Sequence, residues 1–240
     1  MLLDAACGTG GISCGLALRG YDVTGVDISE SALSAAWNKY YNIRDNMTRG
    51  NKFACFFARQ DIRALSLPYA ADAAVCCCDG VNHLLNGNDV SAFFSGVHGN
   101  IRDGGLFIFD INSPWKFDNV YAGNAYIIEA YDKVNKKNVL CAWQNRYNKK
   151  TGLCRFDISL FVERDSKDRT EMYERFDETF SEKRHDPAFI ARLLRECGFA
   201  VLGTVVDFAF TPYDKNKYGD GSGMYDDDQK DRIFYITKKV

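Results

Sequence analysis

The sequence predicts an α/β fold built on a mostly parallel sheet, with an antiparallel β-insert in the second half of the chain. Three observations support this prediction. Short apolar runs alternate with helical stretches as far as Asn112, long runs of period-two alternation follow, and a helix signal with two further apolar runs closes the chain. The 240 residues, 46% of them hydrophobic, suffice for one large domain or one domain with a sizeable insertion.

The first part of the chain is expected to contain five strands joined mainly by helices. The expected strands are 1–5, 21–26, 53–58, 73–78 and 106–111. One helix is expected over 10–19, a second from a cap at Ser29 or Ser31 towards Tyr41, and a third after a cap at Asn88 or Asp89. A turn at 104–105, formed by two glycines, is expected to precede the fifth strand.

Residues 113–184 are interpreted as an insert. Alternating runs at 126–131, 139–147 and 154–162 are separated by turn residues at 135–137, 148–152 and 165–168, which is typical of antiparallel hairpins with one buried face. The core, 1–112, is expected to resume over 185–240 with a helix that begins at Asp186-Pro187 and ends at Gly198. Two closing strands, 199–210 and 232–237, flank an Asp- and Gly-rich loop at 214–231.

Composition narrows the function classes. Thirty basic and thirty-two acidic side chains leave no global positive charge to attract nucleic acid. No apolar run approaches the roughly 20 residues that span a bilayer, and the N-terminus lacks signal-peptide features, so neither a membrane nor export is expected. The nine cysteines form no paired Cys-x-x-Cys spacing, which favours small buried residues in a reducing cytoplasm over disulfides.

No metal site is predicted. The loop at 214–231 has a faint likeness to a calcium-binding loop, but Tyr225 stands where that loop needs a bidentate glutamate.

The strongest functional signal is the segment 2–10, LLDAACGTG, in which a strand ends in an acidic residue and a glycine-rich turn opens a helix. Glycines let the backbone approach a ligand, and a helix N-terminus favours negative charge. Both dinucleotide and adenosylmethionine sites use such a turn. Ser13 stands where the dinucleotide fingerprint has its third glycine, and Asp4 suits the ammonium of a methionine moiety.

Two further carboxylates follow predicted strands. Asp27 ends the second strand and can accept both hydroxyls of a ribose, with Ile28 beside it as an apolar surface for adenine, an arrangement that fits either cofactor. After the third strand, Asp61 could accept the adenine amino group and the Ile62 amide could donate to a ring nitrogen, which favours adenosylmethionine. The alternative interpretation of Asp61 is a helix cap.

Together these motifs resemble the class I S-adenosylmethionine-dependent methyltransferases, in particular the small-molecule branch with a β-insert after the fifth strand. The resemblance covers nearly the whole chain and rests on the segment 4–10, GVDI at 25–28, QDI at 60–62, CDGVNH at 78–83, GGLFIFDIN at 104–112, and Gly198-Phe199. It implies a Rossmann-like fold with a seven-stranded, mostly parallel sheet, closed by an antiparallel strand at 232–237.

The resemblance also implies a cofactor site and a reaction, namely methyl transfer from S-adenosylmethionine to a small molecule. The first turn would hold the methionine end, Asp27 the ribose and Asp61 the adenine, with the methyl group beside the end of the fourth strand. The implied cofactor-binding residues are Asp4, Ala6, Cys7, Gly8, Thr9, Gly10, Asp27, Ile28, Gln60, Asp61, Ile62, Cys78 and Asp79. Family members normally carry a helical segment before the first strand, whereas here only three residues precede Asp4. Three explanations stay open: the sequence is a fragment, the true start lies upstream, or the pocket is unusually open.

A dedicated base is optional for this reaction, because positioning and desolvation carry much of the rate. His83, Asn82 and His185 are the candidate catalytic residues, since histidine titrates near neutral pH and Asn82 ends a predicted strand. The candidate substrate-binding residues are Asn112, Trp115, Trp143 and Tyr147. All of them have structural alternatives, namely hydrogen-bonded histidines, turn asparagines and aromatic packing within the insert. Two functional alternatives also remain: an NAD-dependent oxidoreductase and an inactive cofactor-binding module.

Overall fold

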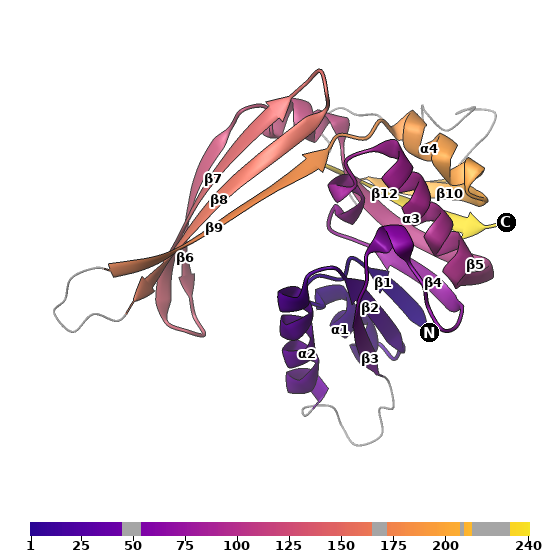
Figure 1. Cartoon of the computed structure of the whole chain (residues 1–240), viewed down its shortest axis with the longest axis horizontal. Coiled ribbons are helices and arrows are strands. Elements are labelled where there is room, and N and C mark those ends of the chain that lie inside the picture. The colour runs from indigo at the N-terminus through magenta and orange to yellow at the C-terminus, as the bar shows by residue number, and fades with distance from the viewer. Residues whose placement is uncertain (45–53, 165–171, 207–208, 213–230) are drawn as a thin grey trace.

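The computed structural model describes residues 1–44, 54–164, 172–206, 209–212 and 231–240. Its strands form two sheets, a central eight-stranded sheet in the order β11-β10-β12-β5-β4-β1-β2-β3 and a four-stranded sheet in the order β6-β7-β8-β9 (Figure 1). The predicted fold class, a mostly parallel α/β sheet with an antiparallel insert, is confirmed.

Five neighbouring strands of the central sheet run parallel. They are β1 (Leu2–Ala5), β2 (Val23–Asp27), β3 (Cys55–Arg59), β4 (Ala71–Cys76) and β5 (Ile101–Asn112). Because they are parallel, their carboxyl ends meet at one edge, where open α/β sheets bind ligands. The short 3₁₀ helices η1 (Ile62–Ala64) and η2 (Gly80–His83) follow β3 and β4 at this edge.

Helices cover both faces of the sheet. Side chains of α1 (Gly11–Leu18) and α2 (Glu30–Arg44) form one buried cluster with β2 and β3. Side chains of α3 (Gly87–Asn100) and α4 (Pro187–Glu196) form the larger cluster on the other face. In β1, Leu3 joins the second cluster while its neighbour Leu2 packs on the first, as the alternation of a strand requires.

The helix caps agree with the sequence prediction in two cases and differ in a third. The Ser29 hydroxyl accepts the Ala32 N–H at 3.2 Å, and Asp186 accepts the N–H two residues further on at 2.8 Å. The cap of α3 is Asn86, so the prediction of Asn88 or Asp89 was wrong. The Asn86 side-chain oxygen accepts the Asp89 N–H at 2.9 Å, and its amide donates back to the Asp89 carboxylate, which makes Asp89 the third residue of the helix.

Two boundaries at the far side of the sheet also differ from expectation. Gly104 and Gly105 do not form a turn before β5 but a bulge within it, where Ala71 pairs with Ile101 and Ala73 with Leu106. The predicted strand 199–210 is two antiparallel strands, β10 (Phe199–Val206) and β11 (Ala209–Pro212), and β11 adds an eighth strand at the edge. As predicted, β12 (Arg232–Lys239) is antiparallel to β5.

The insert forms a long antiparallel arm that arches away from the core (Figure 1). Its strands are β6 (Ala125–Asp132), β7 (Lys137–Asn148), β8 (Leu153–Arg164) and β9 (Met172–Lys183). Near the core, the arm packs on the π-helical turn η3 (Lys116–Val120), with Phe117 and Phe156 fully buried between them. Further out, side chains on both faces reach solvent, so the expectation of one buried face holds only near the core.

Four expectations fall wholly or partly outside the described residues: the turn at 165–168, the first residue of the predicted third strand, positions 207–208 of the predicted strand 199–210, and the loop at 214–231 except Asp231. Within the described part of the chain, the helices are too short or too polar to cross a bilayer.

Candidate functional site

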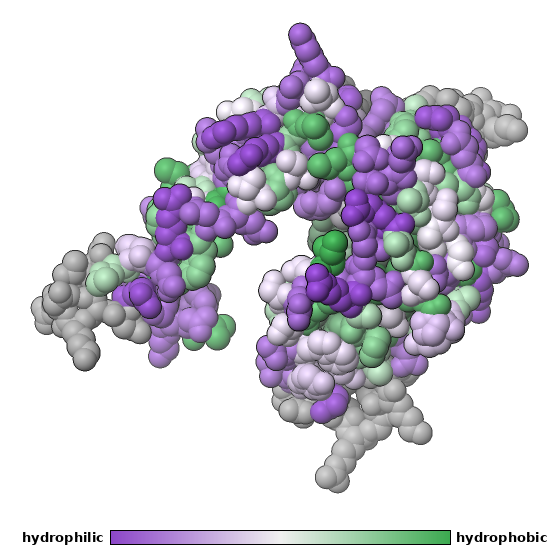
Figure 2. Space-filling model, in the orientation of Figure 1, coloured by the Kyte–Doolittle hydropathy of each residue, from purple (hydrophilic) through white to green (hydrophobic). Residues whose placement is uncertain are grey.

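A cavity of about 1040 Å³ lies at the carboxyl edge of the parallel strands, next to the hollow between core and arm that Figure 2 shows. It is bounded by the first turn of α1, by η1 and η2, and by Glu178 and Phe180 of β9. All the predicted cofactor-binding residues line it except Gly10 and Asp79. They are Asp4, Ala6, Cys7, Gly8, Thr9, Asp27, Ile28, Gln60, Asp61, Ile62 and Cys78.

The glycine-rich turn has a left-handed backbone at Ala6, Gly8 and Gly10, with φ of 56°, 52° and 71°. A Cβ atom added at Gly8 would meet nothing within 4 Å, so this position leaves room for a ligand. A Cβ atom at Gly10 would lie 2.8 Å from the Ala36 Cβ atom and 3.0 Å from the Phe57 ring. Gly8 therefore opens the cavity, while Gly10 allows α1 to pack closely on α2 and β3.

Asp27 joins the two turns that frame the cavity. Its Oδ2 atom accepts the Gly8 N–H at 2.8 Å, and its Oδ1 atom accepts the Ser29 N–H at 2.9 Å. Each carboxylate oxygen can accept a second hydrogen bond, so both can still take a hydroxyl from the cavity side. Ile28, at 59% exposure, presents an apolar side chain to the same space.

Asp4 is almost fully buried and accepts a hydrogen bond from the Ser13 hydroxyl at 2.5 Å. Burial raises the pKa of Asp4 to about 6, although the bond from Ser13 opposes this effect. Ser13, which interrupts the dinucleotide fingerprint, thus orients the acidic residue at the base of the turn.

Asp61 caps η1, as the alternative interpretation anticipated, and also lines the cavity. It accepts the Arg63 N–H at 2.9 Å and pairs with the Arg63 guanidinium at 2.5 Å, and these contacts lower the pKa of Asp61. The Gln60 side-chain nitrogen donates to the Ser66 carbonyl at 2.8 Å, and its side-chain oxygen accepts the Ser66 N–H at 3.0 Å. The Gln60 amide therefore shapes the loop around η1.

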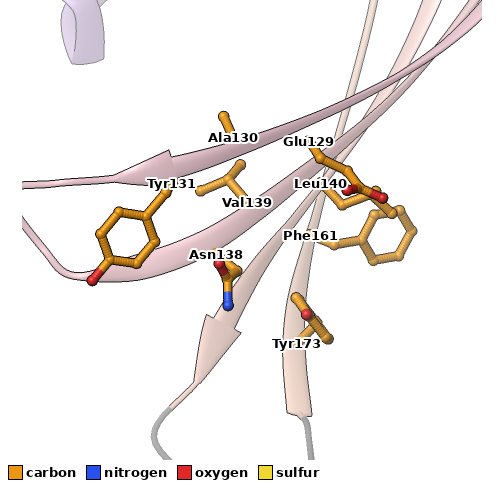
Figure 3. A pocket seen from close by; sticks show the side chains of 8 residues that line it. All are labelled: Glu129, Ala130, Tyr131, Asn138, Val139, Leu140, Phe161 and Tyr173. Carbon is orange, nitrogen blue, oxygen red and sulfur yellow. The ribbon is translucent and has the colours of Figure 1, made fainter.

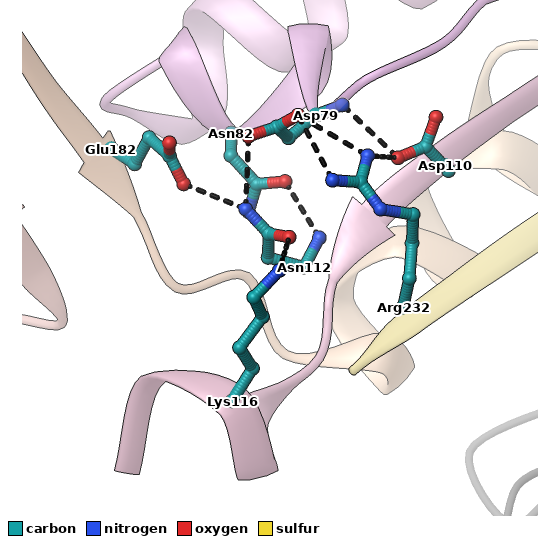
Figure 4. A network of polar contacts seen from close by, with 7 residues as sticks. All are labelled: Asp79, Asn82, Asp110, Asn112, Lys116, Glu182 and Arg232. Atoms are coloured by element: carbon teal, nitrogen blue, oxygen red, sulfur yellow. Dashed lines mark hydrogen bonds and ion pairs between the residues drawn. The ribbon is translucent and has the colours of Figure 1, made fainter. Parts of the chain in front are cut away.

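At the end of β4 the backbone is left-handed at two residues, Cys78 and Asp79, with φ of 61° and 59°. The Asp79 N–H donates to the Asp110 carboxylate at 3.0 Å, and Arg232 of β12 pairs with both carboxylates (Figure 4). Asp110 is fully buried, so the Arg232 charge compensates a carboxylate that water does not reach. These contacts fix the unusual backbone beside the cavity.

Two asparagines tie this loop to the insert. The Asn112 side-chain amide donates to Asp79 at 3.1 Å and to Glu182 of β9 at 2.8 Å (Figure 4). The Asn82 side chain accepts the Asn112 N–H at 2.9 Å and donates to the Lys183 carbonyl at 2.9 Å. Neither asparagine lines the cavity; both hold the walls around it.

The sequence predictions missed Glu182, Asp110 and Arg232. Asp110 lies within the quoted motif at 104–112 and so had a local signal, whereas Glu182 and Arg232 had none. Burial, followed by the nearby Asp79 carboxylate, raises the pKa of Glu182 well above its usual range.

The two candidate histidines differ sharply. His83 is exposed to the cavity, and its ring lies 5.5 Å from that of Phe180. His185 is buried and bonds the Val81 carbonyl at 3.2 Å, and burial lowers its pKa to about 4. His185 is therefore a neutral structural residue, and the structure gives no support to its prediction as a base.

The three aromatic residues predicted to bind substrate do not line the cavity. Trp143 donates to Asn145 at 2.6 Å and packs with Tyr147 at the root of the arm. The Tyr147 hydroxyl donates to Asp118 at 3.2 Å, and the Trp115 carbonyl accepts from a side chain of η3. The packing alternative describes Trp143 and Tyr147 better, because their polar atoms bond within the arm and η3.

A second hollow of about 510 Å³ lies far along the arm and is lined by residues of β6, β7, β8 and β9 (Figure 3). Its lining is mostly apolar or aromatic, with Glu129 as its one carboxylate. It lacks the glycine-rich turn and the group of carboxylates that border the main cavity.

Comparison with known proteins identifies the class. Residues 2–105 match the family model described as a methyltransferase domain. A Bacillus subtilis protein named as a methyltransferase, YqeM, is 31% identical over 211 residues, which cover 88% of this chain and 77% of that protein. The chain belongs to the class I S-adenosylmethionine-dependent methyltransferases.

Two solved structures share its architecture. An S-adenosylmethionine-dependent methyltransferase from Clostridium acetobutylicum is 28% identical, with a TM-score of 0.78 over 99% of this chain and 83% of that one. A sugar N-methyltransferase from a Streptoalloteichus species is 16% identical, with a TM-score of 0.70 over 98% of this chain and 78% of that one. The second comparison concerns the fold alone.

Proposed function

We propose that the cavity binds S-adenosylmethionine with its methyl group at the Cys78 end, and that the acceptor is a small molecule which enters between core and arm. The observation that carries this proposal is the Asp27 carboxylate, which faces the cavity with an unused acceptor position on each oxygen while its backbone contacts fix both turns.

The residues present fit the cofactor. Asp27 would bind the two ribose hydroxyls, and Ile28 and Ile62 would flank the adenine. Both oxygens of Asp61 accept from Arg63, so Asp61 would exchange part of that contact for the adenine amino group. The open backbone at Gly8 leaves space for the methionine moiety.

When bound, S-adenosylmethionine supplies an electrophilic methyl group on a sulfonium. The protein would orient the acceptor in line with the breaking bond and exclude water around it. Phe180 supports the second role, because this aromatic residue of the arm lies on the cavity wall beside His83. We therefore propose that the core, 1–112 and 185–240, binds the cofactor and that the insert, 113–184, completes the acceptor side.

The compartment is a further part of the proposal. All nine cysteines are free, as suits the reducing cytoplasm, where we propose that the enzyme acts.

The test is cofactor-specific stabilisation. A ligand at a hundred times its dissociation constant stabilises the fold by about 2.7 kcal/mol. We expect S-adenosylmethionine and S-adenosylhomocysteine to raise the melting temperature and NAD to leave it unchanged. A rise with NAD alone would contradict the proposal.

A further inference from the structure

We propose that the carboxyl pair Asp79 and Glu182, acting with His83, forms a site that binds the methyl acceptor as a protonated amine and removes its proton. The inference rests on the proposed function and adds to it the acceptor's chemical class and the residues that recognise it. One acceptor atom from each of the three side chains lies within 4.8 Å of the others.

Glu182 is a buried carboxyl group that the rest of the protein leaves without a counter-ion. Its side chain is 3% exposed, accepts a hydrogen bond from Asn112 at 2.8 Å and shares a second hydrogen bond with Asp79, and among the described residues no lysine or arginine forms an ion pair with it. A buried carboxylate without a cation is costly, so Glu182 either keeps its proton or has its charge offset by a cation close by. A cationic ligand would offset it.

The cluster adjoins the cavity where the acceptor would lie. His83 lines the cavity wall and contacts the ring of Phe180, which shares one face of β9 with Glu182. A separation of up to 4.8 Å between the imidazole and the carboxyl groups can be bridged by one water molecule. His83 thus links the acceptor space to the buried pair.

The local charge favours an ammonium over a divalent metal ion. Three carboxyl groups, those of Asp79, Asp110 and Glu182, face two cations, Arg232 and Lys116. Ionisation of Glu182 therefore leaves one net negative charge, which a single ammonium neutralises. A divalent ion would leave one net positive charge, and the Asp79 carboxylate already forms an ion pair with Arg232.

The remaining titratable groups around Glu182 carry no charge. Burial raises the pKa of the Tyr121 phenol and raises that of the Cys154 thiol to about 12, so both stay neutral near pH 7. Glu182 itself, whose pKa is raised by burial and by Asp79, can hold a proton at a pH where an ordinary glutamate cannot. Its pKa lies closer to that of an alkylammonium than the pKa of an ordinary glutamate does, so Glu182 is the better proton acceptor for such a group.

The proposed step is balanced in protons and electrons. The ammonium gives one proton through His83 to the Glu182 carboxylate, which leaves a neutral amine and a neutral carboxyl group. The freed nitrogen lone pair forms the new bond to the methyl carbon as the carbon–sulfur bond breaks, and its electron pair remains on sulfur. The methylated product carries the positive charge that the sulfonium has lost, and Glu182 is left protonated as in the free protein. The one proton set free overall is the proton that Glu182 gives up to solvent when the ammonium binds.

The first experiment uses three amines, cyclohexylamine, benzylamine and glucosamine, with the corresponding alcohols cyclohexanol, benzyl alcohol and glucose. Saturation-transfer NMR is recorded with the full chain in the presence of S-adenosylhomocysteine. We expect a preference for the amines that falls at least tenfold in Glu182→Gln and persists in Glu174→Gln, an isosteric change at an exposed site on the same face of β9. The absence of an amine preference in the wild type, whether both sets bind equally or neither binds, would overturn the proposal.

A second measurement separates proton transfer from a structural role. Calorimetric titration of the best-binding amine at pH 7, in two buffers of different ionisation enthalpy, should show release of up to one proton per site in the wild type and none in Glu182→Gln. Equal release in both proteins would overturn the proposal, as would amine binding that disappears with EDTA and returns with Mg²⁺ or Mn²⁺. Calorimetry of S-adenosylhomocysteine alone distinguishes the two proposals. If S-adenosylhomocysteine does not bind the wild type, the proposed function is contradicted. If it binds the wild type and Glu182→Gln equally and the wild type shows no amine preference, only the amine site is contradicted.

Discussion

The Gly8 N–H donates to the Asp27 carboxylate at 2.8 Å, so the glycine-rich turn after β1 is held by the acidic residue that ends β2. The two most informative motifs in the sequence therefore form one unit, in which Asp27 fixes the backbone and presents its remaining acceptor positions to the cavity.

We expect Asp27→Ala to weaken S-adenosylmethionine binding by about 1.5 to 3 kcal/mol, the usual cost of losing hydrogen bonds to a charged group. Isothermal calorimetry measures the change, and circular dichroism checks that the variant is folded. Asp103→Ala is the control, because that aspartate is 98% exposed and far from the cavity. Unchanged affinity in folded Asp27→Ala would rule out the ribose assignment.

Gly10→Ala should lower the free energy of unfolding by about 2 to 5 kcal/mol, since a left-handed alanine costs about 1 to 2 kcal/mol and overpacking adds about 1 to 3 kcal/mol. The new methyl group would press on Ala36 and Phe57. Gly8→Ala has a similar backbone angle and open space around it, so urea denaturation without cofactor should show a loss of only about 1 to 2 kcal/mol. Equal losses would mean that close packing at Gly10 is unimportant.

Arg232→Met should destabilise the fold by about 3 to 5 kcal/mol, because it leaves the buried Asp110 carboxylate without its cation. Adding Asp110→Asn should recover at least half of that loss, since no buried charge then remains at that position. Urea denaturation of the single and double variants gives the comparison. A double variant no more stable than Arg232→Met would show that charge compensation is not what Arg232 provides.

His185 should titrate near pH 4 when its imidazole signal is followed by NMR. Its pKa in the fold lies below the unfolded value of 6.5, so the unfolded chain binds the extra proton between these pH values. The His185 contribution to stability is thus complete above pH 6.5 and is lost as the pH falls towards 4, by up to about 1.4 kcal/mol per pH unit. The contributions of Asp4 and Glu182 to stability change with pH in the opposite direction, because the pKa of each carboxyl group is raised in the fold. The stability of the wild type is therefore compared with that of His185→Gln, in which only the His185 contribution is missing. The same pH dependence in both proteins would exclude this role.

The sequence predicted the fold well where one local pattern determines one element. Apolar runs located the parallel strands, and Asp186 with Pro187 located the start of α4, because strand burial and helix capping depend on neighbouring residues. It failed where the outcome depends on distant partners. The two adjacent glycines in β5 are also typical of a turn, and only the pairing of Ile101 and Leu106, on either side of them, with β4 makes them a bulge within a strand.

The same distinction holds for the site. The residues of the first turn, Asp27 and Asp61 follow strands and could be found from spacing. Glu182 and Arg232 reach Asp79 across 103 and 153 positions of the chain, and no local pattern reports such a contact. The insert's tryptophan and tyrosine misled the prediction because aromatic residues suit a binding chamber and a packed hairpin equally.

The most direct test of the central claim is a crystal structure of the full chain with S-adenosylhomocysteine. We predict electron density in the cavity beside Gly8, with both ribose hydroxyls within hydrogen-bond distance of the Asp27 carboxylate, the adenine between Ile28 and Ile62, and the sulfur directed towards Cys78. Density for the ligand elsewhere, or a ribose that does not contact Asp27, would contradict the account.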